Sequence, residues 1–408
     1  MLAVFMKYEN LQKIHYKTPE KESSIYQKRF KNEFSKHFDI SIKQYHRCLS
    51  YPAFLCYTEE MFQIQEKVYK NYEEFLSLLR SVPHVVLEQF SLLSIVDEVK
   101  STNDIEGVKS TRREIESILD EIVPCSARLT GVVNKYKNLL SDEEIPFNES
   151  LDIRKFYDDF LHIAIMTDDS SNRLDGVIFR KDSVDIANAT GKTIHQGLMP
   201  ETKIIETMNK ALKILNDTHI PVLIRISLFH YFFAYIHPFY DGNGRTDRFI
   251  TAYYLGKHFH PLVALRLSYT LKRQQKKYYK LFELTDSELN RGDMTPFVIG
   301  FLDMIAESFS DSVHLLKRKK LQLEKYAAKI DSMLPKDELV GEIYFILLQA
   351  ALFYGKGITI QQIEALTHKA RATIQKRLDN MPKDHILKEK IKTKYFYKLN
   401  LLMLKDDK

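Results

Sequence analysis

The spacing of apolar residues along the chain predicts a mainly helical protein. Residues 58–79 repeat apolar side chains at close to the helical period, and 201–216, 245–258 and 298–331 read as further helices. The segment 221–237 is apolar on nearly every side, so we expect it to be the central buried helix of its domain. Twelve prolines and thirteen glycines in 408 residues suit long helices joined by short loops.

Two regions refine this pattern. Residues 176–186 alternate loosely and are rich in β-branched side chains, and the polar segment 188–191 follows them. This combination predicts a short β-hairpin. Residues 101–107 read as a helix that ends at Gly107, and Thr111 and Glu114 have the spacing of a capping box at the start of the next helix.

Length and composition set the domain plan. With 408 residues, of which 44% are hydrophobic, the chain is long enough for two to four domains with sizeable cores. We expect an N-terminal helical region (1–95), a central domain (96–310), a helical linker (311–338) and a C-terminal domain (339–404).

The chain carries no feature of export or membrane insertion. It has no apolar run of about 18 residues, which a membrane span requires. Its three cysteines, Cys48, Cys56 and Cys125, form no disulfide framework, and the first residues lack the basic leader of a secretion signal. These observations predict a cytoplasmic protein that does not bind membranes.

Charge and helix spacing single out the C-terminal domain. The net charge of the chain is +6, and residues 340–404 hold eleven Lys or Arg against five Asp or Glu, so this segment accounts for the whole excess. Helical segments at 342–353, 359–366 and 371–380, followed by strand-like residues 386–399, resemble a winged helix. Its recognition helix would present Arg371, Thr373, Gln375 and Lys376, and its wing residues 388–398. Because winged helices also dock proteins, both DNA and protein remain open as partners.

The segment 237–248 combines several groups that bind anions. It reads HPFYDGNGRTDR and joins the buried helix to the next one. Gly242 and Gly244 permit close approach of a ligand to the backbone, and free N–H groups at the start of a helix attract anions. Arg245 and Arg248 are three positions apart, so both can face one polyphosphate. Asp241 is placed to hold a Mg²⁺ ion that also binds phosphate oxygens.

His237 supplies a base at the edge of this phosphate cradle. An imidazole with an ordinary pKa of about 6.5 can accept a proton from a hydroxyl at neutral pH. One His and one Asp are too few for a zinc site. A base, a carboxylate, two glycines and two arginines within twelve residues therefore favour chemistry on a nucleotide.

The segment 237–248 resembles the complete signature of the Fic family, HPFx(D/E)GNGRxxR, without a departure at any fixed position. The broader resemblance covers about half of the chain, residues 98–302. It implies a Fic-type helical bundle with a short β-hairpin flap. By the resemblance, His237 would be the general base for a Ser, Thr or Tyr hydroxyl of a target protein, and Asp241 would ligate Mg²⁺ between the α- and β-phosphates of ATP.

The same resemblance assigns the other residues of the segment. Gly242, Asn243 and Gly244 would form the anion hole at the α-phosphate, and Arg245 and Arg248 would hold the β- and γ-phosphates. Both loop glycines are present, whereas a kinase-like branch of the family has Ala and Lys there, so the resemblance favours adenylylation over phosphorylation.

Residues outside the signature complete the expected site. The flap near Val184, Asp185 and Ile186 would hold the target segment by strand pairing. Tyr279 and Asn290 sit where relatives contact the nucleoside.

A short motif ahead of the signature predicts a built-in inhibitor. Residues 102–107, TNDIEG, resemble the family's inhibitory motif (S/T)xxxE(G/N), placed before the core as in its second class. A Glu106 carboxylate that pairs with Arg248 would occupy the position of the γ-phosphate and slow the resting enzyme.

The sequence therefore predicts a protein adenylyltransferase that is autoinhibited by Glu106. Removal of AMP by the same site remains open. The alternative is a DNA-binding transcriptional regulator whose Fic core is a nucleotide-responsive or self-modifying switch. Expected partners are ATP and a target protein, with DNA and a second copy of the chain left open.

Overall fold

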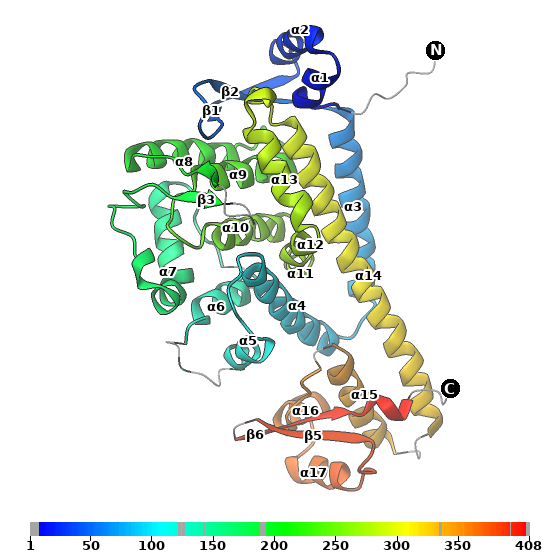
Figure 1. Cartoon of the computed structure of the whole chain (residues 1–408). Coiled ribbons are helices and arrows are strands. Elements are labelled where there is room, and N and C mark those ends of the chain that lie inside the picture. The colour runs from blue at the N-terminus through cyan, green and yellow to red at the C-terminus, as the bar shows by residue number, and fades with distance from the viewer. Residues whose placement is uncertain are drawn as a thin grey trace, which may run out of the picture. The chain divides into compact units, whose positions relative to one another are not determined.

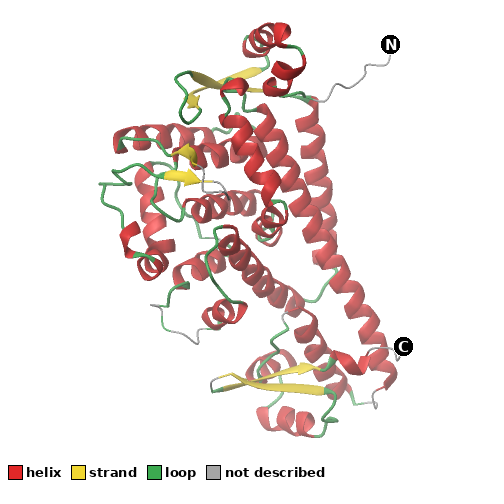
Figure 2. Ribbon diagram, viewed as in Figure 1, coloured by secondary structure: helices red, strands yellow, loops and turns green. Residues whose placement is uncertain are grey.

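The computed structural model describes residues 8–120, 124, 127–141, 143–187, 193–333, 337–353, 355–391 and 393–404. The fold is mainly helical with small β-hairpins, as predicted (Figure 2). The chain divides into two compact units, residues 1–72 with 97–310 and residues 73–96 with 311–408. Of the helices in the described ranges, none combines the length and apolar character needed to cross a membrane.

The first unit holds most of the helices, which are labelled in Figure 1. Three long helices contribute residues to both units: α3 (Glu59–Arg80), α4 (His84–Ile105) and α14 (Thr295–Met333). The division between residues 310 and 311 therefore falls inside α14. The remaining α-helices of this unit are α1 (Leu11–Lys17), α2 (Pro19–Phe30), α5 (Arg112–Leu119), α6 (Thr130–Asn138), α7 (Ser150–Asp168), α8 (Glu201–Asn216), α9 (Val222–Ile236), α10 (Asn243–His258), α11 (Pro261–Ala264), α12 (Leu267–Arg273) and α13 (Gln275–Asp286).

Helix α9 is the centre of this unit. Twelve of its fifteen residues are buried, which confirms the prediction of a central helix from its apolar sequence. It packs against α8 and α10. The predicted capping box also forms, because Thr111 accepts a hydrogen bond from the Glu114 N–H and Glu114 bonds back to the Thr111 backbone.

The N-terminal region is not purely helical, which corrects the prediction for residues 1–95. Strands β1 (Ser35–Lys43) and β2 (Ser50–Cys56) form an antiparallel hairpin with an irregularity between His37 and Ser41. In β1 the side chains of Phe38, Ile40 and Ile42 are buried while the intervening residues are exposed. This two-residue alternation is a strand signal that the helical reading overlooked.

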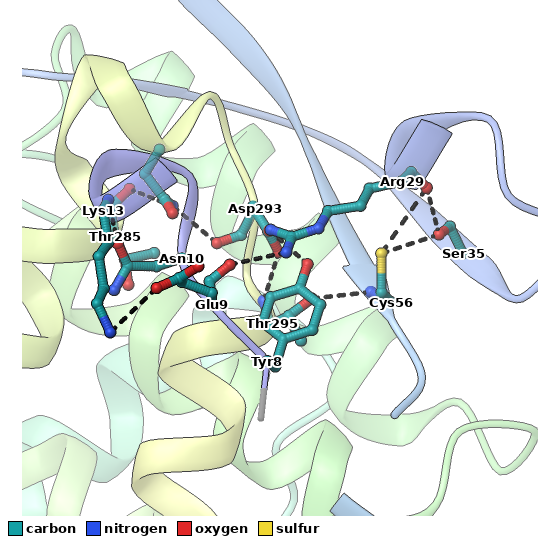
Figure 3. Close-up of polar contacts among 11 residues, drawn as sticks. Tyr8, Glu9, Asn10, Lys13, Arg29, Ser35, Cys56, Thr285, Asp293 and Thr295 are labelled. Atoms are coloured by element: carbon teal, nitrogen blue, oxygen red, sulfur yellow. Dashed lines mark hydrogen bonds and ion pairs between the residues drawn. The ribbon is translucent and has the colours of Figure 1, made fainter. Parts of the chain in front are cut away.

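A buried carboxylate anchors the N-terminal helices to the hairpin and the core (Figure 3). Asp293 is fully buried and accepts hydrogen bonds from the Tyr8 hydroxyl (2.6 Å) and the Thr295 N–H (2.9 Å), with Arg29 3.5 Å away. The Thr295 hydroxyl in turn accepts the Cys56 N–H. Because a buried carboxylate is costly without partners, these contacts favour one placement of the N-terminal segment.

The second unit ends in three helices and a hairpin. Helices α15 (Glu338–Phe353), α16 (Ile360–Thr367) and α17 (Arg371–Asp379) precede the antiparallel strands β5 (Ile386–Ile391) and β6 (Lys394–Leu399). Ile358, between α15 and α16, forms an isolated antiparallel bridge with Tyr397 of β6. The order is therefore helix, bridge, helix, helix, hairpin.

Candidate functional site

The loop between α9 and α10 takes its shape from two residues with positive φ. Helix α9 ends where His237 adopts a left-handed conformation (φ 52°, ψ 64°), and Pro238 excludes further helix. Gly242 has φ +84° and caps α10, and a Cβ there would lie 2.6 Å from the Leu161 side chain. A left-handed histidine is uncommon, and such strain is concentrated at functional sites.

Neighbouring side chains hold the loop rigid. The Asn243 side chain accepts the Phe239 N–H (2.9 Å) and donates to the Phe239 carbonyl (2.8 Å). The ring of Tyr157 on α7 stacks on Phe239 with centroids 3.7 Å apart, and its hydroxyl donates to the Asp241 carbonyl. The Asn243 side chain is therefore a brace within the loop, which leaves only its backbone N–H for the anion hole expected from the sequence.

Arg245 is a buried cation with spare donors. Its side chain is inaccessible to solvent and donates one hydrogen bond, from Nη2 to Asp241 Oδ2 at 3.1 Å. Its Nε and Nη1 have no hydrogen-bond partner among the described residues. Unpaired buried guanidinium donors are costly, so this geometry fits the binding of an anionic ligand.

Arg248, one turn further along α10, is held by the end of α4. Its Nε donates to the Thr102 hydroxyl (2.8 Å), and its Nη2 donates to the Thr102 carbonyl (3.1 Å) and lies 2.7 Å from Glu106 Oε1. Burial acts to lower the pKa of Arg248, but the charge of Glu106 outweighs it and raises that pKa above its ordinary value. A Cβ on Gly244 would lie 2.1 Å from Glu106 Oε1, so the carboxylate rests directly against the start of α10.

His237 presents a neutral imidazole beside the loop. Its Nδ1 lies 3.3 Å from the Ala234 carbonyl, which favours the tautomer with the proton on Nδ1 and leaves Nε2 as the acceptor. Burial, helped by the charges of His195 and Arg180, lowers the pKa of His237 to about 3. The side chain is therefore available as a base throughout the neutral range.

Arg180 is a positioning residue that the sequence analysis did not identify. It is fully buried and donates to the carbonyl oxygens of His237 (2.9 Å), Leu198 (2.9 Å) and Asp182. It thus joins both sides of the flap to the backbone of His237. A lone arginine in an irregular segment has no periodic signal, so only the fold reveals this role.

The flap is shorter than the alternating sequence predicted. Strand β3 covers Asp185–Ala187 and β4 covers Thr193–Gln196, while residues 176–183 are irregular. The predicted turn at 188–191 lies outside the described residues. Asp185 pairs with Gln196 and Ile186 with His195, and the Val184 carbonyl accepts the Gly197 N–H. The His195 ring contacts the Tyr235 carbonyl (2.7 Å), which ties β4 to α9.

The two expected nucleoside contacts fall in different surroundings. Tyr279 on α13 is partly exposed, and its hydroxyl lies 3.5 Å from the Ile105 carbonyl at the end of α4, next to Glu106. Asn290 is fully buried, and its amide donates to the Thr285 and Asp293 carbonyls. No hydrogen bond among the described residues joins Asn290 to the loop at 237–248.

The loop offers one carboxylate for a cation. Asp241 is partly exposed and accepts the Gly242 N–H as well as the Arg245 bond. The described residues contain no group of three His, Cys, Asp or Glu side chains that would enclose a metal ion. One carboxylate is still suited to Mg²⁺, which is commonly bound by one or two carboxylates together with substrate phosphates.

Comparison with known proteins agrees with this geometry. A model of the Fic/DOC family matches residues 157–255. "Protein adenylyltransferase Fic" of Drosophila erecta is 39% identical to the chain over 87 residues, and the protein of the same name from Drosophila melanogaster is 38% identical. Each alignment covers 21% of this chain and only 16% of the relative.

A solved structure extends the likeness in fold. The crystal structure of a Fic family protein from Desulfovibrio desulfuricans G20 aligns with a TM-score of 0.51 at 19% identity, over 84% of this chain and 96% of that one. The family model includes the loop, both arginines and the flap, whereas Glu106 and the C-terminal unit lie outside it. The segment 157–255 of this chain is therefore a Fic/DOC family domain.

Proposed function

We propose that this protein is an adenylyltransferase that moves AMP from ATP to a hydroxyl group of a target protein. The observation that carries the proposal is a pair of donors on buried Arg245 that have no partner in the part of the chain that the structure describes. They lie at the start of a helix, next to the loop that carries the neutral imidazole of His237. A polyphosphate supplies the acceptors that the arginine lacks. The similarity to proteins named adenylyltransferases points to the same chemistry.

The residues of the loop divide the reaction between them. The target hydroxyl gives its proton to Nε2 of His237 as its oxygen bonds to the α-phosphorus. The bond from that phosphorus to the bridging oxygen breaks, and pyrophosphate leaves. The backbone N–H groups of Asn243 and Gly244 stabilise the charge on the α-phosphate, and the Gly242 N–H joins them once Asp241 Oδ1 releases it. Arg245 holds the departing phosphates. Asp241 would hold Mg²⁺, which neutralises phosphate charge when it is bound.

Glu106 restrains this activity in the resting protein. Its carboxylate lies 2.7 Å from Arg248 Nη2 and against Gly244, where it competes with a terminal phosphate for the same guanidinium. ATP must therefore displace Glu106 before Arg248 can bind a phosphate.

Transfer of label from ATP tests the proposal. We would incubate Glu106→Gly and the double variant Glu106→Gly/His237→Ala with α-labelled ATP and Mg²⁺, and follow label on protein. Label that accumulates only in the variant with His237 intact supports the transferase. Label that is equal in both variants, or absent from both while ATP binds, contradicts it, and release of AMP from premodified protein would then identify the reverse activity.

A further inference from the structure

The C-terminal unit carries most of the unbalanced charge of the protein. Residues 368–398 contain ten Lys or Arg and three Asp or Glu, a net charge of +7, whereas the whole chain has +6. The rest of the chain therefore sums to −1. This positive charge is concentrated in the 31 residues that include α17 and the β5–β6 hairpin. Such a segment is suited to a polyanionic partner.

Most of these cations are exposed and have no acidic partner. Within the described part of the chain, no ion pair is formed by any of six exposed side chains, Lys369, Arg371, Lys376, Lys388, Lys390 and Lys394. Arg377 differs, because it pairs with Asp337 at 2.9 Å. Surface lysines elsewhere in the chain do find acidic partners, as Lys272 does with Asp104. The unpaired set therefore remains available to a ligand.

Two lysines of the hairpin share one of its faces. Lys388 lies opposite Tyr397 and Lys390 opposite Tyr395, so these four residues lie on one face, while Glu389 and Lys394 lie on the other. The ammonium groups of Lys388 and Lys390 lie 4.4 and 5.5 Å from the centre of the Tyr395 ring. These cation–π contacts hold two positive charges together on the side that lacks the glutamate.

Helix α17 presents a second row of donors. Arg371, Thr373 and Lys376 are exposed, whereas Ile374 and Leu378 are buried and fasten the helix to its unit. A helix of this kind fits the major groove of a duplex, and a hairpin beside it can reach the adjoining phosphates. Within the unit, α17 immediately precedes the hairpin in the chain.

The composition of the surface decides between nucleic acid and protein. Large hydrophobic side chains that are exposed on α17 and the hairpin are limited, in the described residues, to Leu387 and Tyr395. Protein interfaces concentrate apolar and aromatic residues at their core and are depleted of lysine. A surface rich in lysine and poor in apolar area matches phosphate backbones instead.

We propose that the surface formed by α17 and the β5–β6 hairpin binds duplex DNA through its phosphates. This inference is independent of the proposed transferase activity, since none of its residues belongs to the 237–248 loop. It would bring the Fic domain to a DNA-bound location, where proteins on the same duplex are the available targets.

Fluorescence anisotropy on the full-length chain tests this. The probe is a labelled mixed-sequence DNA duplex of about 24 base pairs, titrated at several salt concentrations around about 0.1 M. The hairpin variant Lys388→Gln/Lys390→Gln/Lys394→Gln should bind at least about tenfold more weakly, and the slope of log K against log salt should fall by about 2 to 3. Arg371→Gln/Lys376→Gln should also weaken binding.

Two further variants serve as controls. Lys21→Gln/Lys28→Gln/Lys31→Gln removes the same charge from exposed lysines of the other unit and should bind as the wild type does. Lys388→Arg/Lys390→Arg/Lys394→Arg keeps the charge and should retain binding. The proposal is overturned if the wild type does not bind the duplex at low salt, if the two glutamine triple variants lose equal affinity, or if the same chain binds double-stranded RNA more tightly than DNA.

Discussion

Replacing Glu106 by glycine removes the carboxylate that pairs with Arg248 and that we propose to compete with a phosphate of ATP. The pair is well placed to matter, because Arg248 is 1% exposed, Glu106 is 28% exposed and their atoms are 2.7 Å apart. A hydrogen bond between charged groups in such a position is worth about 1.5 to 3 kcal/mol. If ATP must break it to bind, the variant should bind ATP roughly ten- to a hundredfold more tightly.

The rate of label transfer should follow the same factor. At ATP concentrations below saturation, Glu106→Gly should modify protein roughly ten- to a hundredfold faster than the wild type. At saturating ATP the difference should shrink, unless Glu106 also misplaces the bound nucleotide. Calorimetry with ATP and Mg²⁺ measures the affinity separately from the chemistry.

Two matched variants define what would refute this reasoning. Glu144→Gly makes the same substitution at an exposed loop position of the same unit and should leave both quantities unchanged. Glu106→Gln keeps the size of the side chain but not its charge, and should lie between wild type and glycine. ATP affinity and transfer rate within twofold of wild type in both Glu106 variants would show that the ion pair does not restrain the site.

Three other predictions follow from single contacts. Because the pKa of His237 is about 3, below its ordinary value of 6.5, the neutral imidazole persists as the pH falls. The rate of AMP transfer by Glu106→Gly should therefore change little between about pH 5.5 and 7.5. A loss of rate with a midpoint near the ordinary imidazole pKa would contradict this. Burial raises the pKa of Glu98 from 4.5 to about 7, so its contribution to stability is present below the lower value and is lost as pH rises through the higher one. Glu98→Gln should therefore raise the melting temperature at pH 8 but not at pH 4.5. Thermal unfolding at both pH values measures this, and an equal shift of the melting temperature at the two values would refute the reasoning. Arg180→Met leaves three carbonyl oxygens without their donor and should cost about 2 kcal/mol or more in the free energy of unfolding; denaturant unfolding measures this, and a stability equal to that of wild type would refute the bracing role.

Local signals predicted the main helices and the turn between α9 and α10 well. The buried helix α9, the capping box at Thr111 and the turn at Gly242 all depend on residues within a few positions of one another. Their hydrogen bonds and backbone preferences are therefore contained in a short stretch of sequence. Strand β1 could have been predicted by the same reasoning, because buried and exposed residues alternate regularly from His37 to Lys43.

The flap shows the limit of pattern reading. Residues 176–183 alternate like a strand but are irregular, because their backbone is bound by other partners. The Ile178 and Phe179 N–H groups donate to the Glu201 carboxylate on α8, and the Arg180 side chain donates to the His237 carbonyl. Contacts from distant residues here outweigh the local β preference.

The sequence by itself determined the composition of the site: a base, a carboxylate, two arginines and a glycine-rich turn, all within twelve residues of a helix junction. It also named Glu106. Tertiary structure alone decided how these groups meet, since Thr102 and Arg248 are 146 positions apart and Arg180 and His237 are 57 apart. Such contacts depend on how whole helices pack against one another. The free energy that favours this packing comes from the whole buried core of the unit and not from any single segment of sequence.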